Sequence, residues 1–235
     1  MSVTGIVLAG GRATRFGGPK LAAELNGRSI LDLAIVALSD VVDEILVAGP
    51  EALNLPELEE LVERPGLARR PDARPRGDVG LRIVADAAPF AGPLAALEGA
   101  LGEARGDIAV VVGGDMPRLV PNVLRSMVAH LMAAPTLEAV LLGSPGATPD
   151  AAGRTEQRRQ VLPVVLGIGA ASTAARAALD AGDRSLRALL DRLASEEIPP
   201  ERWLLLDPAA TTLRDVDTRA DLDRLQAPGS AREVP

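Results

Sequence analysis

The sequence contains no cysteine and a single histidine, His130. The absence of cysteine excludes disulfides, thiolate nucleophiles, thiolate-bound zinc and iron–sulfur clusters. One histidine is too few for a multi-histidine metal site, and we expect His130 to be a structural residue on an apolar helix. Aromatic residues make up only 1% of the chain. This scarcity excludes a recognition surface built from stacked aromatic side chains.

Long uncharged apolar runs and a positive net charge are also missing. The formal net charge is −7, which argues against nonspecific binding to nucleic acid or to an anionic membrane. No apolar run approaches the roughly 18 residues that a membrane-spanning helix needs, and the first residues lack the pattern of a signal peptide. We therefore expect a cytoplasmic protein that has neither nucleic acid nor membrane as a partner.

The alternation of elements predicts the fold. The chain of 235 residues is long enough for one α/β domain over 1–235. Short apolar runs predict strands over 3–8, 44–48, 81–85, 107–112, 138–142, 160–165 and 203–206. Helical periodicity and caps predict helices over 29–38, 93–103, 121–132, 170–180, 185–194 and 218–225. This order predicts a Rossmann-like three-layer fold with a mainly parallel sheet and a ligand beyond the carboxyl ends of its strands.

Two further segments differ in composition from this pattern. Residues 51–80 are rich in proline and arginine, so we expect an exposed insertion there. We also expect a flexible tail after about residue 227.

The stretch GIVLAGGRATRFGGPKL, residues 5–21, predicts a phosphate-binding loop. Its glycines have the wrong spacing for the dinucleotide fingerprint, and Leu21 stands where a P-loop needs Ser or Thr. The loop still has the features by which both of those motifs bind phosphate. Backbone amides at Gly10 and Gly11 can approach phosphate oxygens, while Arg15 and Lys20 supply positive charge. Lys20 is the only lysine among 25 basic residues. A site that needs a compact ammonium would retain lysine in a chain that otherwise uses arginine.

Two aspartates are candidate metal ligands. Asp115 follows the apolar run 108–112 through two glycines, and a carboxylate at that edge suits Mg²⁺. The alternative is a helix cap ahead of Pro117. Asp217 is a possible second ligand, or else a cap of the last helix.

Five motifs, in order, resemble those of the molybdenum cofactor guanylyltransferases, in the MobA-like nucleotidyltransferase group. The first is Leu8-Ala9-Gly10-Gly11 with Arg15, Gly17 and Lys20. The others are Ala91-Gly92-Pro93-Leu94-Ala95, Gly114-Asp115-Met116-Pro117, Gly182-Asp183-Arg184-Ser185-Leu186-Arg187, and Asp217-Thr218 with Asp221-Leu222. The resemblance covers nearly the whole chain and implies the fold of the nucleotide-diphospho-sugar transferases.

The resemblance also implies substrates and roles. It implies transfer of GMP from GTP to molybdopterin, with Mg²⁺ as cofactor and pyrophosphate as the other product, and transient contacts with proteins of the molybdenum cofactor pathway. It assigns catalysis to Arg15, Lys20 and Asp115, and metal binding to Asp115 and Asp217. The acceptor-binding residues would be Arg184, Ser185 and Arg187. The nucleotide-binding residues would be Leu8, Ala9, Gly10, Gly11, Lys20, Asp86, Gly92, Pro93, Leu94 and Asp115.

Two other functions stay open at this point. Asp215-Val216-Asp217 replaces the Asn-x-Asn common in guanylyl members and looks more like cytidylyl-transferring relatives, which favours a cytidylyl or sugar-nucleotide transferase. In the opposite direction, those relatives tend to have L-A-A-G in the first loop, where this chain has L-A-G-G. From a different class, the chain could be a nucleotide-binding protein for cofactor insertion that has lost turnover. The presence of Lys20 and Asp115 argues against that function.

Overall fold

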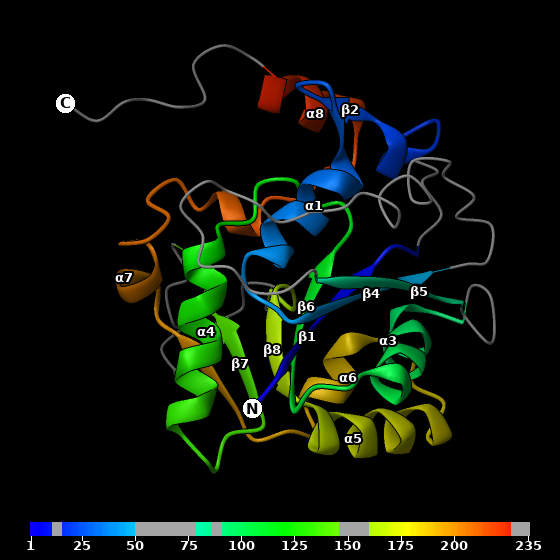
Figure 1. Ribbon diagram of the computed structural model, residues 1–235, viewed down its shortest axis with the longest axis vertical. Helices are drawn as coiled ribbons and strands as arrows, with labels where there is room; N and C mark the ends of the chain where they lie inside the picture. Colours follow the sequence, from blue (N-terminus) through cyan, green and yellow to red (C-terminus); the bar gives the residue numbers. More distant parts are fainter. Residues whose placement is uncertain (11–15, 50–78, 86–90, 146–159, 227–235) are drawn as a thin grey trace, which may run out of the picture.

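A mixed sheet of seven strands runs through the part of the chain that the structure describes (Figure 1). This computed structural model describes residues 1–10, 16–49, 79–85, 91–145 and 160–226. The strand order is β5-β4-β1-β6-β8-β7-β9, and β8 alone runs antiparallel to its neighbours. The strands are β1 (Val3–Leu8), β4 (Glu44–Gly49), β5 (Gly80–Ala85), β6 (Ile108–Gly113), β7 (Ala139–Leu142), β8 (Val164–Gly167) and β9 (Ser195–Ile198).

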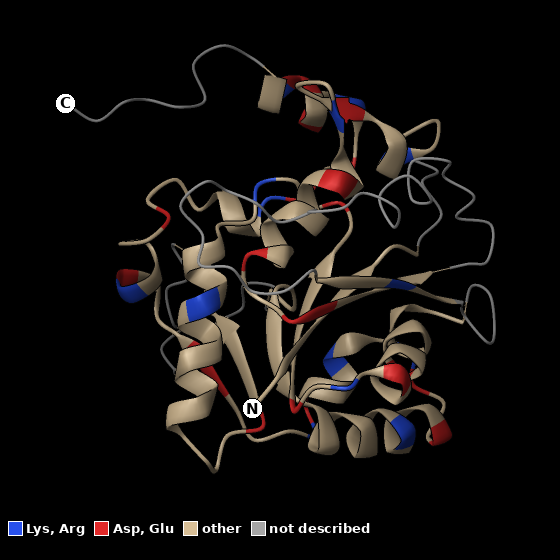
Figure 2. Ribbon diagram, in the orientation of Figure 1, with Lys and Arg blue, Asp and Glu red and all other residues tan. Residues whose placement is uncertain are grey.

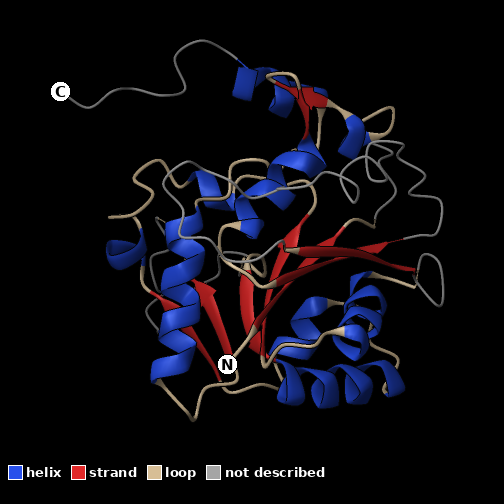
Figure 3. Ribbon diagram, viewed as in Figure 1, coloured by secondary structure: helices blue, strands red, loops and turns tan. Residues whose placement is uncertain are grey.

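Helices cover both faces of this sheet, which gives three layers (Figure 3). Alternate side chains of each buried strand enter two separate cores: in β1, Val3 and Val7 face one core, whereas Ile6 and Leu8 face the other. The first core is completed by α1 (Ile30–Ser39) and α4 (Pro121–Ala133). The second is completed by α3 (Pro93–Glu103), α5 (Ile168–Asp180) and α6 (Leu186–Leu190). The predicted three-layer α/β fold with a mainly parallel sheet is therefore confirmed.

A smaller unit lies above the sheet, and we call residues 16–29 and 214–226 the cap (Figure 1). It contains a one-turn 3₁₀ helix (Lys20–Ala22), the hairpin β2 (Glu24–Leu25) and β3 (Arg28–Ser29), and the C-terminal helix α8 (Arg219–Gln226). Its apolar side chains, together with Ile30 of α1, form a third core made of Phe16, Leu25, Ile30, Val216, Leu222 and Leu225. Packing of these residues joins the two segments of the cap, which are far apart in the sequence.

Two side-chain contacts join the segments of the cap, and Figure 2 marks the acidic and basic residues along its ribbon. The guanidinium of Arg219 lies over the Phe16 ring, 5.2 Å from its centroid, a cation–π contact. The Gln226 amide donates to the Glu24 carbonyl oxygen at 2.9 Å. Arg219 and Gln226 therefore join the C-terminal segment of the cap to its N-terminal segment.

The predicted strand over 203–206 is wrong. A short helix, α7 (Pro200–Trp203), occupies this segment and is followed by a turn, because Pro200 suits the first position of a helix. The Trp203 indole donates to the Gly143 carbonyl oxygen at 3.0 Å, which fixes the turn against the sheet. The outer strand is instead β9, whose two exposed glutamates weaken its apolar pattern.

Other boundaries differ by a few residues, and one hairpin was missed. The strand predicted over 160–165 is β8, which begins at Val164, and the helix predicted over 185–194 ends at Leu190. The β2–β3 hairpin was not predicted, although Asn26 and Gly27 carry it with φ of 55° and 78°. Asn-Gly between two strands is typical of a tight hairpin turn.

Several predictions concern residues outside the described ranges. These are the insertion up to residue 78, the tail from 227, and three site residues: Gly11, Arg15 and Asp86.

A second short 3₁₀ helix (Thr211–Leu213) precedes the C-terminal segment of the cap. Among the helices that the structure describes, none is long and apolar enough to cross a membrane.

Candidate active site

The carboxyl ends of β1 and β6 meet at one edge of the sheet and bring the first glycine loop beside Asp115. The two strands are parallel neighbours in a register that pairs Leu8 with Gly113. The Leu8 carbonyl oxygen then accepts from the Gly114 amide at 2.9 Å. Leu8 and Ala9 have buried side chains, and Gly10 is exposed at the edge. Gly10, and not the side chain of Leu8 or Ala9, is therefore accessible to a ligand at this edge.

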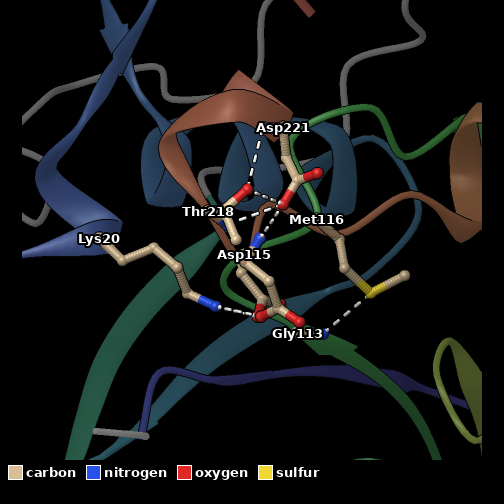
Figure 4. Close-up of polar contacts among 7 residues, drawn as sticks. Lys20, Gly113, Asp115, Met116, Thr218 and Asp221 are labelled. Carbon is tan, nitrogen blue, oxygen red and sulfur yellow. Dashed lines mark hydrogen bonds and ion pairs between the residues drawn. The ribbon is translucent and has the colours of Figure 1, made fainter. Parts of the chain in front are cut away.

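Two glycines position the Asp115 carboxylate. A Cβ atom on Gly113 would collide with Oδ1 of Asp115, so this carboxylate folds back over the end of its own strand. A Cβ on Gly114 would lie 3.1 Å from Leu31. The Gly113 amide donates to the Met116 sulfur at 3.3 Å (Figure 4). The next helix starts only at Pro121, with Val120 as its N-cap, so Asp115 does not cap a helix.

The Lys20 ammonium contacts both predicted metal ligands, and Figure 4 shows its contact with Asp115. Its ammonium nitrogen donates to Asp115 Oδ2 at 2.8 Å and to Asp217 Oδ1 at 3.0 Å. The Lys20 side chain is only 15% exposed, compared with 28% for Asp115 and 52% for Asp217. Burial lowers the pKa of Lys20, but its bonds to Asp115 and then Asp217 outweigh burial and raise that pKa above its ordinary value. The ammonium therefore stays charged.

A reciprocal capping box next to Asp217 excludes the capping role that was its alternative. Thr218 Oγ1 accepts from the Asp221 amide at 3.2 Å, and Asp221 Oδ2 accepts from the Thr218 amide at 2.7 Å. This pattern is typical of a helix start. Thr218 and Asp221 therefore begin α8 (Figure 4), and the Asp217 carboxylate is left to contact Lys20.

Asp215 is a third carboxylate near this group, and the prediction from sequence did not assign it a role. Desolvation, followed by the negative charges of Asp217 and Asp115, raises the pKa of the Asp215 carboxyl. The signal for it was the Asp-x-Asp spacing, since side chains two apart on an extended segment lie on the same side.

The donor set fits a magnesium ion that also binds a substrate. In the described residues, no three acidic, histidine or cysteine side chains converge closely enough to hold a metal by themselves. Two carboxylates do converge, on Lys20. Mg²⁺ in phosphate-transferring sites uses one or two carboxylates and takes its other ligands from phosphates and water. Asp115 and Asp217 therefore suit an ion that arrives with a polyphosphate.

Two other predicted motifs contact each other. Gly92 has φ of 100°, and a Cβ there would lie 2.9 Å from the Arg184 carbonyl oxygen. The same oxygen accepts from the Leu94 amide at 3.4 Å. The Leu94 side chain is buried in the second core, and Pro93 is exposed at the start of α3. The segment that carries Arg184 therefore supports the turn that begins α3.

The side chains predicted to bind the acceptor have local partners. The Arg184 guanidinium donates to the carbonyl oxygens of Leu179 and Asp183 at 3.3 and 3.0 Å. Ser185 Oγ accepts from the Ala188 amide at 3.3 Å and caps α6. Arg187 is exposed. In this structure, the first two side chains stabilise helix ends.

Residues 5–197 match the model of a protein family described as the MobA-like NTP transferase domain. The chain belongs to this family. Its members are nucleotidyltransferases, and the phosphate-loop lysine and the Asp115 segment both lie within the matched range.

Two known proteins are similar to this MobA-like chain, one in sequence and one in structure. A "Probable molybdenum cofactor guanylyltransferase" from Chloroflexus aggregans is 29% identical over 230 residues, which cover 97% of this chain and 95% of that protein. The molybdopterin-guanine dinucleotide biosynthesis protein A of Archaeoglobus fulgidus has a TM-score of 0.67 at 19% identity, covering 95% of this chain and 96% of that one.

A protein named for a different base has the same fold. The 4-diphosphocytidyl-2C-methyl-D-erythritol synthase of Anaerococcus prevotii has a TM-score of 0.64 at 13% identity, covering 96% of each chain. The seven-stranded MobA-like architecture therefore does not by itself select the nucleotide.

Proposed function

We propose that this protein transfers GMP from GTP to the phosphate of molybdopterin and releases pyrophosphate, giving a molybdopterin guanine dinucleotide. The observation that carries the proposal is the convergence of Lys20, Asp115 and Asp217 at the carboxyl edge of β1 and β6. The motif order and the guanylyltransferase names of relatives support the substrates.

The bond changes are those of an in-line displacement. An oxygen of the acceptor phosphate attacks the α-phosphorus of GTP, and the bond from that phosphorus to the oxygen bridging to the β-phosphate breaks. Negative charge then grows on the leaving pyrophosphate. Such transfers depend on alignment and charge neutralisation more than on a protein nucleophile, which suits a chain without cysteine.

The residues of the site have separate tasks in this proposal. Lys20, with Arg15 from the same loop, neutralises the β- and γ-phosphates and the leaving pyrophosphate. Asp115 and Asp217 hold Mg²⁺, which when bound withdraws charge from the phosphate oxygens. The backbone amides of Gly10 and Gly11 contact phosphate oxygens in this proposal.

A cytidylyl transfer is the second candidate, favoured by Asp215-Val216-Asp217 at the end of the chain. One assay separates the two. Purified protein is given molybdopterin, Mg²⁺ and each of the four nucleoside triphosphates in turn, and pyrophosphate release and product mass are measured. We expect release with GTP and a product heavier than molybdopterin by one guanylyl group, that is GMP less one water; a clear preference for CTP would contradict the guanylyl assignment.

Binding without turnover is a distinct outcome of this assay. If GTP bound but none of the four nucleotides released pyrophosphate, the protein would act as a carrier for cofactor insertion. A variant outside the site serves as the control for this assay. Glu98→Gln removes the charged partner of Arg176 in an exposed ion pair between α3 and α5. We expect this variant to keep wild-type turnover.

A further inference from the structure

Lys20 occupies the position in which a cation touches both acidic ligands at once. Its ammonium nitrogen lies 2.8 Å from Asp115 Oδ2 and 3.0 Å from Asp217 Oδ1. These are the same two oxygen-bearing groups that the proposed function assigns to the divalent metal. In the absence of ligand, the protein therefore provides its own positive charge at the metal position.

Lys20 neutralises part of the acidic charge of the site. The carboxylates of Asp115 and Asp217, with that of Asp215 beside them, interact unfavourably with one another. Lys20 offsets this repulsion, and its side chain is the least exposed of the ion-pair partners at 15%. A metal ion that binds the same two oxygens, Asp115 Oδ2 and Asp217 Oδ1, would displace this ammonium.

The position of Lys20 allows its ammonium group to move away from Asp115 and Asp217. Lys20 stands in the cap, on a one-turn 3₁₀ helix whose N-cap is Pro19; Gly17 and Gly18 come before this proline, and a Cβ on either glycine would meet nothing within 4 Å. Its flexible four-carbon stem carries a compact charge that can exchange one set of oxygens for another. The polyphosphate of a nucleotide offers such oxygens.

We propose that Lys20 is an internal counter-cation that competes with the divalent metal for Asp115 and Asp217, and that nucleotide polyphosphate draws it away and admits the metal. This inference rests on the proposed function and adds an order of binding to it: metal enters with the nucleotide or after it. It also explains why the chain keeps one lysine here among arginines, because a planar guanidinium is a poorer substitute for a small ion.

The first test measures Mn²⁺ binding to the full-length protein by electron paramagnetic resonance, without nucleotide. We expect weak binding by the wild type and at least tenfold tighter binding by Lys20→Met. Lys20→Arg keeps the positive charge but carries the poorer substitute for a small ion, so its Mn²⁺ affinity should lie between those of the wild type and Lys20→Met. Adding Asp115→Asn to Lys20→Met should remove the gain.

A matched control separates local competition from net charge. Arg176→Met also removes one positive charge, but from the exposed pair with Glu98. We expect its Mn²⁺ affinity to equal that of the wild type. If Lys20→Met and Arg176→Met tightened Mn²⁺ binding equally, or neither did, the competition would be refuted.

A second test needs no variant. Selective ¹⁵N-lysine labelling gives one side-chain Nζ signal, because Lys20 is the only lysine in the chain. We expect GTP alone to shift this signal. Mg²⁺ alone should leave it unchanged at concentrations that saturate the GTP complex, and a shift by Mg²⁺ alone at those concentrations would overturn the inference.

The same experiments keep this inference apart from the proposed function. If wild-type protein with GTP fails to retain Mn²⁺, metal-dependent transfer at these carboxylates is wrong. If it retains Mn²⁺ but Lys20→Met shows no tightening without nucleotide, only the competition is wrong.

Discussion

The main-chain amide of Val216 donates to the carbonyl oxygen of Asp115 at 2.9 Å. This bond attaches the C-terminal segment to the loop after β6. The Val216 side chain is fully buried in the third core, and in an extended segment its neighbours Asp215 and Asp217 lie on the opposite side. The apolar contact that fixes the cap therefore also presents the acidic residues to Lys20.

The first prediction concerns Val216→Ala. The smaller side chain leaves a cavity in the third core, so the free energy of unfolding should fall by about 2 kcal/mol, as measured by urea denaturation. Asp217 should also lose its fixed position, so Mn²⁺ binding to the GTP complex should weaken several-fold. Val123→Ala is the control, since Val123 is equally buried but lies in α4. If the control weakened Mn²⁺ binding as much, Val216 would have no positioning role.

The two carboxylates proposed to bind the metal should differ in their effect on turnover. Asp115 is held over Gly113 and is half as exposed as Asp217, at 28% against 52%. Asp115→Asn should lower kcat/KM by about 10²- to 10³-fold, the range typical of losing one group that stabilises transition-state charge. Asp217→Asn should lower it by about tenfold. Steady-state assays of pyrophosphate release give both values, and equal losses would contradict this ranking.

The elements that position the site could be predicted from sequence because each depends on local signals. The apolar runs of β1 and β6 and the glycines after them require little information beyond the nearest few residues, and their parallel pairing follows from the alternation of strands and helices. Lys20 and Asp115 were therefore placed correctly at one edge, although 95 positions separate them.

The parts that could not be predicted depend on tertiary contacts. No signal in the neighbouring sequence indicates that Val216 packs in a core with Phe16 and Leu25. That core brings Asp215 and Asp217 to the site. The sequence around Arg184 predicts an anion-binding motif. In the structure, however, the Arg184 guanidinium donates to nearby carbonyl oxygens. The strand predicted at 203–206 failed because one turn of helix and one apolar strand give similar short patterns.

A substitution at Gly92 should separate the contact with Arg184 from ordinary helix propensity. In Gly92→Ala the new Cβ meets the Arg184 carbonyl oxygen at 2.9 Å, and φ of 100° is unfavourable for alanine. We expect a loss of stability of about 1 to 3 kcal/mol and a higher KM for GTP. Gly99→Ala, inside the same helix with open space around the new Cβ, should stabilise by up to about 1 kcal/mol. Thermal denaturation compares them, and equal effects would exclude the contact.

Glu44 should make stability depend on pH in the acid range. Its carboxylate accepts from Thr4 Oγ1 at 2.8 Å, from the Arg105 amide at 2.6 Å and from Arg82 at 3.1 Å. Desolvation raises the pKa of Glu44, but these donors together outweigh it and lower that pKa below its ordinary value of 4.5. A lowered carboxyl pKa stabilises the fold above the unfolded-state value, and this stability is lost as the pH falls through the folded-state value.

The variant Glu44→Gln should therefore be less stable than the wild type by about 1 to 2 kcal/mol near pH 7, and this difference should be constant down to about pH 5. Below about pH 4.5 the difference should shrink, because the wild-type carboxylate becomes protonated. Urea denaturation of both proteins between pH 7 and pH 3.5 measures it. Glu103→Gln is the control, since Glu103 is an exposed partner of Arg82 and surface pairs contribute little. A difference that grew as the pH fell would reverse the sign and refute the role of Glu44.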